Sequence, residues 1–530
     1  MGIVGEGRFE SAMRRMTQDA SYWEELSITS QDLDFLGNLL VEREIPLSLD
    51  EMARALVVHR CQQEEERIAR ELSKGMLYLP KNSYQPGEVV VFPAFEFAAA
   101  EVIDTREGHN PEYGAFRVIR VRFPNGRLRE FASELESHPL NEALIDQGGQ
   151  VASPEELYQE HGPRVRALLN ARLEAEPAFI RLANEWFLKE LLVEIKPGQL
   201  NVAEAVLDVA GGGPLPTEKL AGELDLPKEI DPRLGIFSLN YALLEDERFD
   251  EVGPAGEVLW YLRRLEPADV LNPPSRLRPQ QVEYDRRLLD EAMLILERRL
   301  DDEWAEAGVP PEGERRVTVV LSYPHLRSGT LPLSPRLAGI FPTGRTHRIR
   351  FLFRDGDSGQ EMEGWVVRER RFVYGLGEWY ARHNLPIGAY IDLERADEPG
   401  VVVVRRRPTR LRRDWVRVAT VNDARLTFEM RPFPLSCEYD DQMIIAVEDL
   451  ATLDAVGERV RNHRLSLAQV VAEIFPELAK LSPQGTVHAA TLYSAVNVAM
   501  RVPPGPIFNV LRESYDLMGD NYWISRRRGG

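Results

Sequence analysis

The chain has 530 residues, a formal net charge of −20 and a hydrophobic fraction of 43%. A chain of this length is too long to fold around a single hydrophobic core, so we expect about four or five domains of roughly 100 to 150 residues. No stretch approaches the ~20 apolar residues of a membrane span, and the first residues lack a signal-peptide pattern, so we expect no membrane partner. Cys61 and Cys437 are too few for a disulfide framework or a cysteine zinc site, which indicates a cytoplasmic protein with two buried cysteines.

Residues 1–79 form an N-terminal helical domain by pattern. Asp32 is the expected polar cap of one helix, and leucines recur behind it from Leu33 to Leu40. A polar cap followed by an apolar stripe is typical of an amphipathic helix. We therefore expect three short helices in this domain.

Residues 80–145 change to a β pattern. Polar and apolar residues alternate from Phe116 to Phe123, and Asn125-Gly126 is a hairpin signal. We expect a small five-strand, SH3-like β-barrel here, followed by a helical linker region over residues 150–197. Five arginines of the barrel either form one basic face or are solvated outer residues, and the second alternative is favoured: Arg117, Arg120, Arg122, Arg127 and Arg129.

The most specific local pattern lies in residues 198–268. Helices are expected over Asn201–Ala210, over Pro216–Leu224 and from Gly235. A hairpin follows, in which Phe249 enters and Trp260 returns to the core. The pattern predicts three helices closed by a hairpin.

Residues 461–530 repeat this order. Helices are expected over Leu467–Leu478, Val487–Val498 and Ile507–Ser514, before a hairpin over Tyr515–Ile524. The aromatic, glycine and tryptophan positions of the two hairpins correspond, so we expect two copies of one fold. An insertion through Pro503-Pro504 delays the third helix of the second copy.

Both copies resemble the HARE-type winged helix of the RNA polymerase delta subunit and of some restriction and chromatin proteins. The resemblance implies a platform for DNA or for protein. Glu245-Asp246-Glu247 follows the third helix of the first copy and would repel phosphate, so protein contact or packing is favoured there. Arg526-Arg527-Arg528, after the second copy, either holds phosphate or is a solvated tail.

Two connectors join these segments to a central domain. Apolar residues recur at helical spacing from Pro279 to Glu306, so residues 276–308 are expected to form one rigid connecting helix. Residues 423–460 are expected to be a mixed β and helical connector.

The stretch from Arg315 to Arg417 reverses the charge of the chain. It holds twenty arginines, no lysine and eleven carboxylates, so it carries +9 while the other residues carry −29. Guanidinium groups bond phosphates and base edges bidentately, so a nucleic-acid surface is favoured. The alternative is that these arginines pair with the acidic remainder of the same chain.

The pattern of residues 314–422, which include this basic stretch, predicts a β-rich domain. Strands are expected over Val317–Leu321, Ile349–Phe353, Gly364–Val367, Phe372–Tyr374, Tyr390–Leu393 and Val401–Arg405, with helices over Ser334–Phe341 and Gly377–His383. Trp365 and Trp379 are expected to fill the core. This order, with its closing turn from Leu385 to Gly388, is similar to the DNA-binding pseudobarrel of plant transcription factors and restriction-enzyme effector domains.

That resemblance implies two arms that clasp DNA, the loop Tyr323–Gly329 and the hairpin Arg368–Arg371. The candidate nucleic-acid contacts are Arg327, Arg345, Arg348, Arg350, Arg368, Arg370 and Arg371. For each of them the alternative is a solvated strand residue.

Catalytic motifs are missing from the sequence. It has no Gly-x-x-x-x-Gly-Lys phosphate loop, no His-x-x-x-His pair and no Gly-x-Ser-x-Gly elbow. Asp301-Asp302-Glu303 and Asp440-Asp441 are interpreted as solvated or helix-flanking charge rather than a metal site. We expect no catalytic residues, no metal and no cofactor.

These observations predict an α+β multi-domain protein in which winged helices, a small SH3-like barrel and a β-pseudobarrel are joined by helical segments. The expected function is non-enzymatic nucleic-acid binding, to duplex DNA first and RNA as the alternative, with a role in transcription or its regulation implied by resemblance alone. The winged helices are expected to contact protein or DNA. The rival interpretations are a protein-interaction scaffold without nucleic acid and a restriction-like or repair enzyme.

Overall fold

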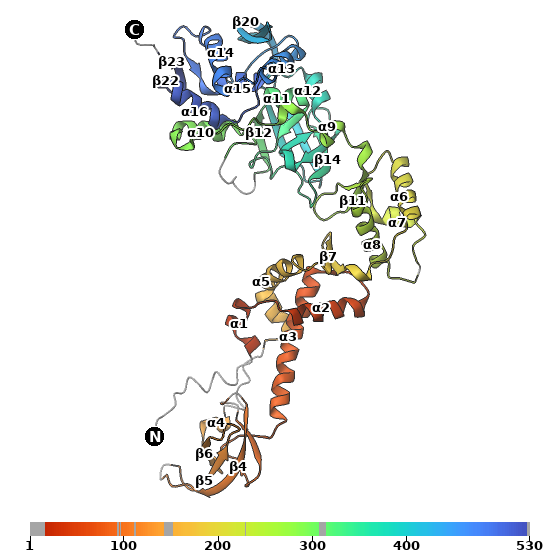
Figure 1. The fold of residues 1–530 in the computed structure, drawn as a ribbon, viewed down its shortest axis with the longest axis vertical. Coiled ribbons are helices and arrows are strands. Elements are labelled where there is room, and N and C mark those ends of the chain that lie inside the picture. The colour runs from red at the N-terminus through yellow and green to blue at the C-terminus, as the bar shows by residue number, and fades with distance from the viewer. Residues whose placement is uncertain are drawn as a thin grey trace. The chain divides into compact units, whose positions relative to one another are not determined.

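The computed structural model describes residues 16–92, 95, 97–110, 113–142, 152–227, 229–306 and 314–526. The chain forms two compact units, Met1–Glu194 with Pro227–Ser238 and Ile195–Leu226 with Leu239–Gly530. Each unit combines helices with sheets, so the expectation of an α+β protein is confirmed (Figure 1). None of the helices in these ranges is long and apolar enough to cross a lipid bilayer.

The first unit starts with α1 (Ala20–Glu24), α2 (Ser30–Arg43) and α3 (Leu49–Leu72). Thr29 caps α2, and Asp32 completes a capping box from the third helical position. The expected cap, Asp32, is therefore one turn inside the helix, where it is buried and lies 2.5 Å from Arg60. The expectation of three short helices is wrong for α3, which has 24 residues.

A later helix and a hairpin complete this part of the first unit. They are α5 (Pro154–Glu174), β7 (Phe179–Leu182) and β8 (Glu185–Leu188). The short strand β1 (Leu47–Ser48) pairs with β8, which gives a sheet in the order β1-β8-β7. The helical expectation for residues 150–197 is right for α5 and wrong for the hairpin, where Trp186 and Phe187 are buried.

Between α3 and α5 the chain forms a five-stranded sheet. Its strands, in spatial order, are β2 (Met76–Leu77), β3 (Val89–Phe92), β4 (Ala98–Glu107), β5 (Arg117–Arg122) and β6 (Leu128–Ser133), and the short helix α4 (Pro139–Glu142) follows. The expected five strands are confirmed. The predicted alternation is present on β5, where Ile119 and Val121 are buried and the arginines are exposed.

Residues 197–262 form three helices and a hairpin, as predicted; the third of these helices starts in the first unit and ends in the second. They are α6 (Pro197–Val209), β9 (Leu215–Pro216), α7 (Thr217–Glu223), α8 (Pro232–Glu245), β10 (Phe249–Glu251) and β11 (Leu259–Leu262). Strand β9 pairs with β11, so the sheet order is β10-β11-β9. Trp260 plugs the core, and its Nε1 donates to Asn240 at 2.9 Å.

The C-terminal region also follows its prediction. It contains α14 (Leu467–Ala479), β21 (Val487–His488), α15 (Ala489–Ala499), α16 (Pro504–Ser514), β22 (Tyr515–Gly519) and β23 (Tyr522–Ser525). The sheet order is β21-β23-β22. Every residue of α15 is buried, and so is most of α16.

One arrangement therefore occurs three times in the chain. We name the copies the first module (residues 30–72 and 154–188), the second module (197–262) and the third module (467–525). In each, the short strand pairs with the last strand of the hairpin in one register: Leu47 opposite Trp186, Leu215 opposite Trp260 and Val487 opposite Trp523. The sequence predicted only two copies because the five-stranded sheet separates the second and third helices of the first module.

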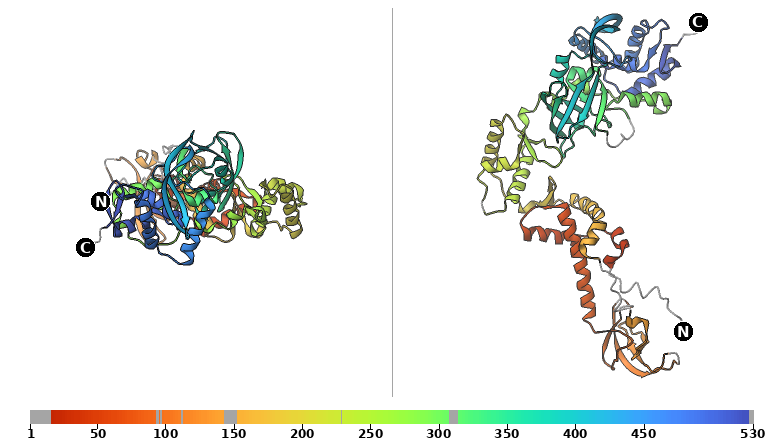
Figure 2. Two further views of the ribbon diagram at one scale, coloured as in Figure 1. Left: turned by 90° about the horizontal axis from the view of Figure 1, so that it is seen from above. Right: turned by 180° about the vertical axis from the view of Figure 1, so that it is seen from behind.

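A seven-stranded sheet forms the curled half-barrel of the second unit (Figure 2). In spatial order its strands are β12 (Arg316–Val320), β17 (Tyr390–Arg395), β18 (Val401–Arg406), β14 (Arg348–Asp355), β15 (Glu361–Val367), β16 (Phe372–Tyr374) and β13 (Thr330–Pro332). Six of these strands and helix α12 (Gly377–His383) were predicted, with small shifts of the strand ends. Trp365 and Trp379 are fully buried, as expected.

Two of the expected helices differ from the observed structure. The connecting helix is limited to α10 (Glu291–Leu300), because the side chain of Asp290 accepts from the Met293 amide at 3.0 Å and starts the helix there. Residues 334–341 form consecutive turns instead of a helix. The remaining short helices are α9 (Ala268–Leu271), α11 (Tyr323–Ser328) and α13 (Asp454–Asn462).

A long antiparallel hairpin leaves the half-barrel after β18. Its strands are β19 (Pro408–Asn422) and β20 (Arg425–Cys437), and we name this hairpin the ribbon. Its tip packs against the third module, since Ala419, Leu426 and Phe428 belong to a core that the half-barrel and that module share. The expected end of the pseudobarrel at residue 422 falls at the turn of the ribbon.

Candidate nucleic-acid interface

The first expected DNA arm, Tyr323–Gly329, is helical. Pro324 lies in the first turn of α11, and Gly329 ends the helix with a φ of 64°. Apart from Arg327, the helical residues are buried. Arg327 donates to Asp454 from Nη2 at 2.8 Å, and Tyr323 donates to the same carboxylate at 2.7 Å. The expectation of a loop is therefore wrong, and Arg327 forms an ion pair with Asp454 of the same chain.

Arg348 and Arg350 are also paired inside the chain. Arg348 contacts Asp250 on β10, and its Nε lies 3.0 Å from Oε2 of the buried Glu266. Nε of Arg350 donates to Glu363 on the adjacent strand at 2.8 Å. These arginines join the half-barrel to the second module or tie its strands together.

The second expected arm is present as a tight turn between β15 and β16. The Arg368 amide donates to the His347 carbonyl at 2.9 Å, so this turn adjoins the loop that holds Arg345. Arg371 lies over the ring of Trp304 at 4.9 Å and donates to the Glu303 carbonyl at 3.0 Å. We name Arg345, His347, Arg368, Arg370 and Arg371 the basic turn; all are exposed except the half-buried Arg368.

Most other arginines of the half-barrel are ion-paired as well. Each has a carboxylate of the same chain within 4 Å. The pairs are Arg315–Asp397, Arg316–Glu394, Arg336–Asp301, Arg354–Glu361, Arg405–Glu394, Arg406–Asp357 and Arg407–Asp392. Six of these seven pairs use carboxylates of the same basic stretch. Pairing with the acidic remainder of the chain, the alternative explanation of the charge reversal, is therefore met by Arg336 and, as described above, by Arg327 and Arg348.

The ribbon differs from the half-barrel because one of its faces is both apolar and exposed. Trp415 and Leu411 are each 69% exposed, and Met430 is 39% exposed. Trp415 lies opposite Pro432 in the strand pairing, so the two side chains share this face. All eight tryptophans lie within the described ranges; six are at most 2% exposed, Trp304 is half-buried, and Trp415 is the exposed one.

Three arginines of the ribbon have no carboxylate partner. Arg413 lies opposite Pro434 and shares the face of Trp415. Arg410 precedes it on β19, and Arg425, which pairs with Asn422, lies on the opposite face of the ribbon; all three are exposed. Within the described ranges, none of the three side chains has a hydrogen bond or an ion pair. An exposed aromatic ring beside unpaired guanidinium groups suits a ligand with planar rings and negative charge.

Sequence reasoning missed the ribbon face. The signal was the period-two pattern Leu411, Arg413, Trp415, read together with Pro432 and Pro434 on the partner strand. The two strands were not recognised as one hairpin because the predicted boundary at residue 422 assigned β19 to the pseudobarrel and β20 to the connector. The pairing of the two strands identifies the shared face.

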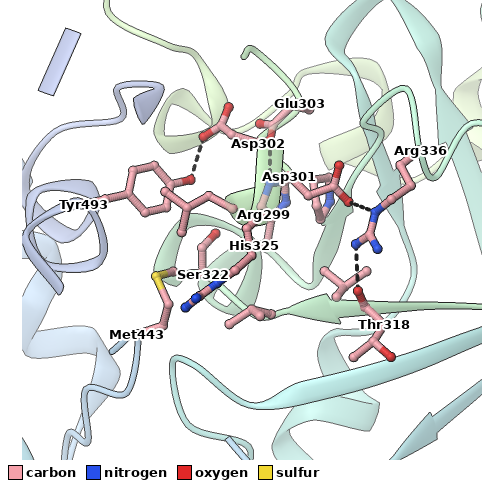
Figure 3. Close-up of a pocket in the computed structure, with 14 residues that line it drawn as sticks. Arg299, Asp301, Asp302, Glu303, Thr318, Ser322, His325, Arg336, Met443 and Tyr493 are labelled. Atoms are coloured by element: carbon pink, nitrogen blue, oxygen red, sulfur yellow. Dashed lines mark hydrogen bonds and ion pairs between the residues drawn. The ribbon is translucent and has the colours of Figure 1, made fainter. Parts of the chain in front are cut away.

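The acidic run 301–303 is buried rather than solvated. Asp301 lies 2.9 Å from Nε of Arg336 (Figure 3). Asp302 and Glu303 each lie 2.7 Å from Arg501. The run follows α10, so the helix-flanking part of the interpretation holds. Asp440, 8% exposed, is likewise buried and accepts from the amides of Gln442 and Met443. Burying a carboxylate is costly unless it is hydrogen-bonded, and each of these carboxylates has hydrogen-bond donors.

His325 and Tyr493 complete the network shown in Figure 3. Nε2 of His325 lies 3.2 Å from Glu303, and the Tyr493 hydroxyl donates to Asp302 at 2.6 Å. Burial alone raises the pKa of Glu303, but Arg501 and His325 outweigh it and hold the pKa well below its usual range. The adjoining cavity is about 30 Å³, room for roughly one water molecule. This network therefore joins the half-barrel to the third module and has no space for a substrate.

No group of three or more His, Cys, Asp or Glu side chains in the described part of the chain suits a metal ion. The chain matches no protein family, and no curated protein and no solved structure is significantly similar to it. The candidate site is therefore argued from its own geometry.

Proposed function

We propose that this protein binds nucleic acid, and duplex DNA in the first instance, through the ribbon. The observation that carries this proposal is Trp415, an aromatic side chain 69% exposed on a strand that also carries Arg410 and Arg413 without acidic partners. Guanidinium groups supply phosphate contacts, and an exposed indole supplies a stacking or methyl contact to a base. The half-barrel supports the ribbon rather than reading the DNA itself.

The dimensions of the ribbon suit duplex DNA. A two-stranded β-ribbon fits the major groove, which is about 12 Å wide. On this proposal the face of Trp415 and Arg413 enters the groove, and Arg413 and the neighbouring Arg410 contact phosphates at its edge. Arg345 and Arg370 of the basic turn supply a second, sequence-independent phosphate contact.

The three modules are proposed to be winged helices that contact protein rather than DNA. In the third module the helix in the recognition position, α16, is largely buried. In the second module Ser238 and Asn240 of α8 are buried, and Asn240 accepts from Trp260. Helices used for packing in this way cannot enter a DNA groove, so the modules support a scaffold around the ribbon. A role in transcription remains an expectation from resemblance.

The test compares Trp415→Ala with a matched arginine control in the full chain. Fluorescence anisotropy with labelled 20-base-pair duplex, single-stranded DNA and RNA would measure affinity at two salt concentrations. Burying an exposed apolar side chain is worth about 1.5–3 kcal/mol, so Trp415→Ala is expected to weaken duplex binding by roughly 10- to 150-fold. Arg350→Ala, which removes an arginine bound to Glu363, is expected to change affinity less than about threefold. Equal losses in both variants would contradict the proposal.

A second candidate function is favoured by the apolar part of the same face. Leu411, Met430 and two prolines accompany Trp415, and aromatic, methionine and arginine side chains are enriched in protein–protein interfaces. In that case the ribbon docks a protein. Binding of nucleic acid that falls steeply with salt supports the first candidate, whereas salt-independent silence in the same assay supports the second.

A further inference from the structure

A groove between the half-barrel and the third module forms a second candidate site, separate from the ribbon. It has a volume of about 540 Å³. Pockets that hold small ligands typically measure about 300–1,000 Å³. Its walls come from the segment around Arg278, from α13 and from the end of α15, which lies beside α13. All of these belong to the second unit.

Arginines dominate the charge of this groove. Arg278, Arg461 and Arg464 line it and are exposed, and their side chains form no hydrogen bond or ion pair with any described residue. They come from two separate segments of the chain, so their convergence is a product of the fold. Unpaired guanidinium groups that converge on one cavity favour an anion with several oxygen atoms.

The carboxylates of the groove do not cancel this charge. Asp454 lies 2.8 Å from Arg276 and 2.8 Å from Arg327, so two arginines already neutralise it. Glu458, the other lining carboxylate, is exposed. The three unpaired arginines therefore remain available to a ligand.

A buried donor also lines the groove. Arg501 is 6% exposed, and its Nη atoms donate to Asp302 and Glu303. Its Nε–H finds no acceptor among the described residues. A buried donor without a partner is costly, so an acceptor supplied by a ligand would stabilise it.

The other lining residues suit the organic part of a ligand, provided that this part also carries hydrogen-bond donors. The side chains of Val460, Val498 and Met500 give the groove apolar walls. The last turn of α15 also lies there, and the final carbonyl groups of a helix have no helical donors. Hydroxyl or amino groups of a ligand would meet these acceptors.

We propose that the groove formed by Arg278, Arg461 and Arg464 binds a phosphorylated small molecule that also carries hydroxyl or amino groups, such as a nucleoside diphosphate. The phosphates contact the three arginines, and the organic body lies against the apolar walls. This site is independent of the ribbon, so the protein takes two kinds of ligand.

Isothermal titration calorimetry of the full chain tests this proposal, with adenosine diphosphate and inorganic pyrophosphate as probes at constant ionic strength. The double variant Arg278→Ala with Arg461→Ala is expected to lose at least about tenfold in affinity for both probes, because each arginine contributes a charge-assisted contact. Arg287→Ala, whose side chain is 90% exposed and pairs only with Asp285, is the matched control and is expected to bind normally.

Three results would overturn the proposal. Silence with both probes at millimolar concentration would exclude the site. Equal affinity in the double variant and the wild type would mean that the probes bind elsewhere. Pyrophosphate bound as tightly as adenosine diphosphate would exclude an organic body in the groove. Trp415→Ala is expected to leave both titrations unchanged, which separates this site from the ribbon.

Discussion

Two strand pairings of the half-barrel and one of the ribbon show why some arginines have carboxylate partners and others have none. In the half-barrel, Arg316 lies opposite Glu394 and Arg354 opposite Glu361. On the ribbon, Arg413 lies opposite Pro434. Cross-strand pairs of opposite charge stabilise a sheet, whereas proline leaves the guanidinium group without a partner. Charge counted along the sequence therefore does not show which arginines lack a carboxylate partner.

Removing an arginine that pairs with carboxylates is expected to lower stability, whereas removing an unpaired arginine is expected to leave it nearly unchanged. The buried network around Arg501 gives the largest expected loss. Arg501→Met leaves Asp302 and Glu303 buried without their cation, so the free energy of unfolding is expected to fall by about 3–5 kcal/mol. Urea denaturation of the full chain measures this change. A loss below about 1 kcal/mol would mean that the network does not join the half-barrel to the third module.

A second pair of variants compares the half-barrel and the ribbon directly. Arg348→Ala removes the partner of Asp250 and of the buried Glu266, so a loss of about 2–3 kcal/mol in unfolding free energy is expected. Arg413→Ala removes no partner and is expected to change stability by less than about 0.5 kcal/mol. Equal effects in chemical denaturation would remove the distinction between structural and available arginines.

The pH dependence of stability tests the environment of Glu251, a half-buried carboxyl near Arg345 of the basic turn. Burial raises the pKa of Glu251 to about 7, and Arg345 opposes that shift. Because the raised pKa penalises the ionised form in the folded state, this carboxyl lowers the free energy of unfolding as pH rises from about 5 to 8. At about 1.4 kcal/mol per pKa unit, the decrease reaches about 3 kcal/mol.

Glu251→Gln is the test of that linkage. It keeps the acceptor for the Gly253 amide but cannot ionise, so the variant is expected to be more stable than wild type at pH 8 and nearly equal at pH 5. Urea titrations at the two pH values measure both differences. A stabilisation of the same size at both pH values would point to packing rather than to charge.

The smallest expected effect concerns salt. Arg410→Ala with Arg413→Ala removes two proposed phosphate contacts, so the slope of log affinity against log salt is expected to become shallower by about 2. Removing Arg354, which is paired with Glu361 and Glu398, is expected to leave the slope unchanged. An unchanged slope in the ribbon variant would assign the phosphate contacts to another surface.

Local patterns predicted most of the fold. The helices and hairpins of the second and third modules and six strands of the half-barrel follow from period and cap signals, because these depend on neighbouring residues. The first module escaped because its strand pairing, Leu47 opposite Trp186, joins residues far apart in the sequence. No local signal reports a pairing across an inserted sheet.

The candidate site was predicted less well, for a related reason. Arginine-rich composition drew attention to Arg327, Arg348 and Arg350, but their carboxylate partners, Asp454, Asp250 and Glu363, are set by tertiary contacts. The exposure of Trp415 could not be read from sequence either, since the other strand tryptophans are core residues. The sequence suggested anion binding by arginines as a hypothesis, and the fold decides which arginines lack carboxylate partners.

Photo-cross-linking tests the central claim most directly. The full chain would be irradiated with duplex DNA that carries photoreactive thymidine analogues, and the adducts mapped by mass spectrometry. The account predicts adducts between residues 410 and 434, with Trp415 among them, and their loss in Trp415→Ala. Adducts confined to β14 and β15 of the half-barrel, with none on the ribbon, would contradict it.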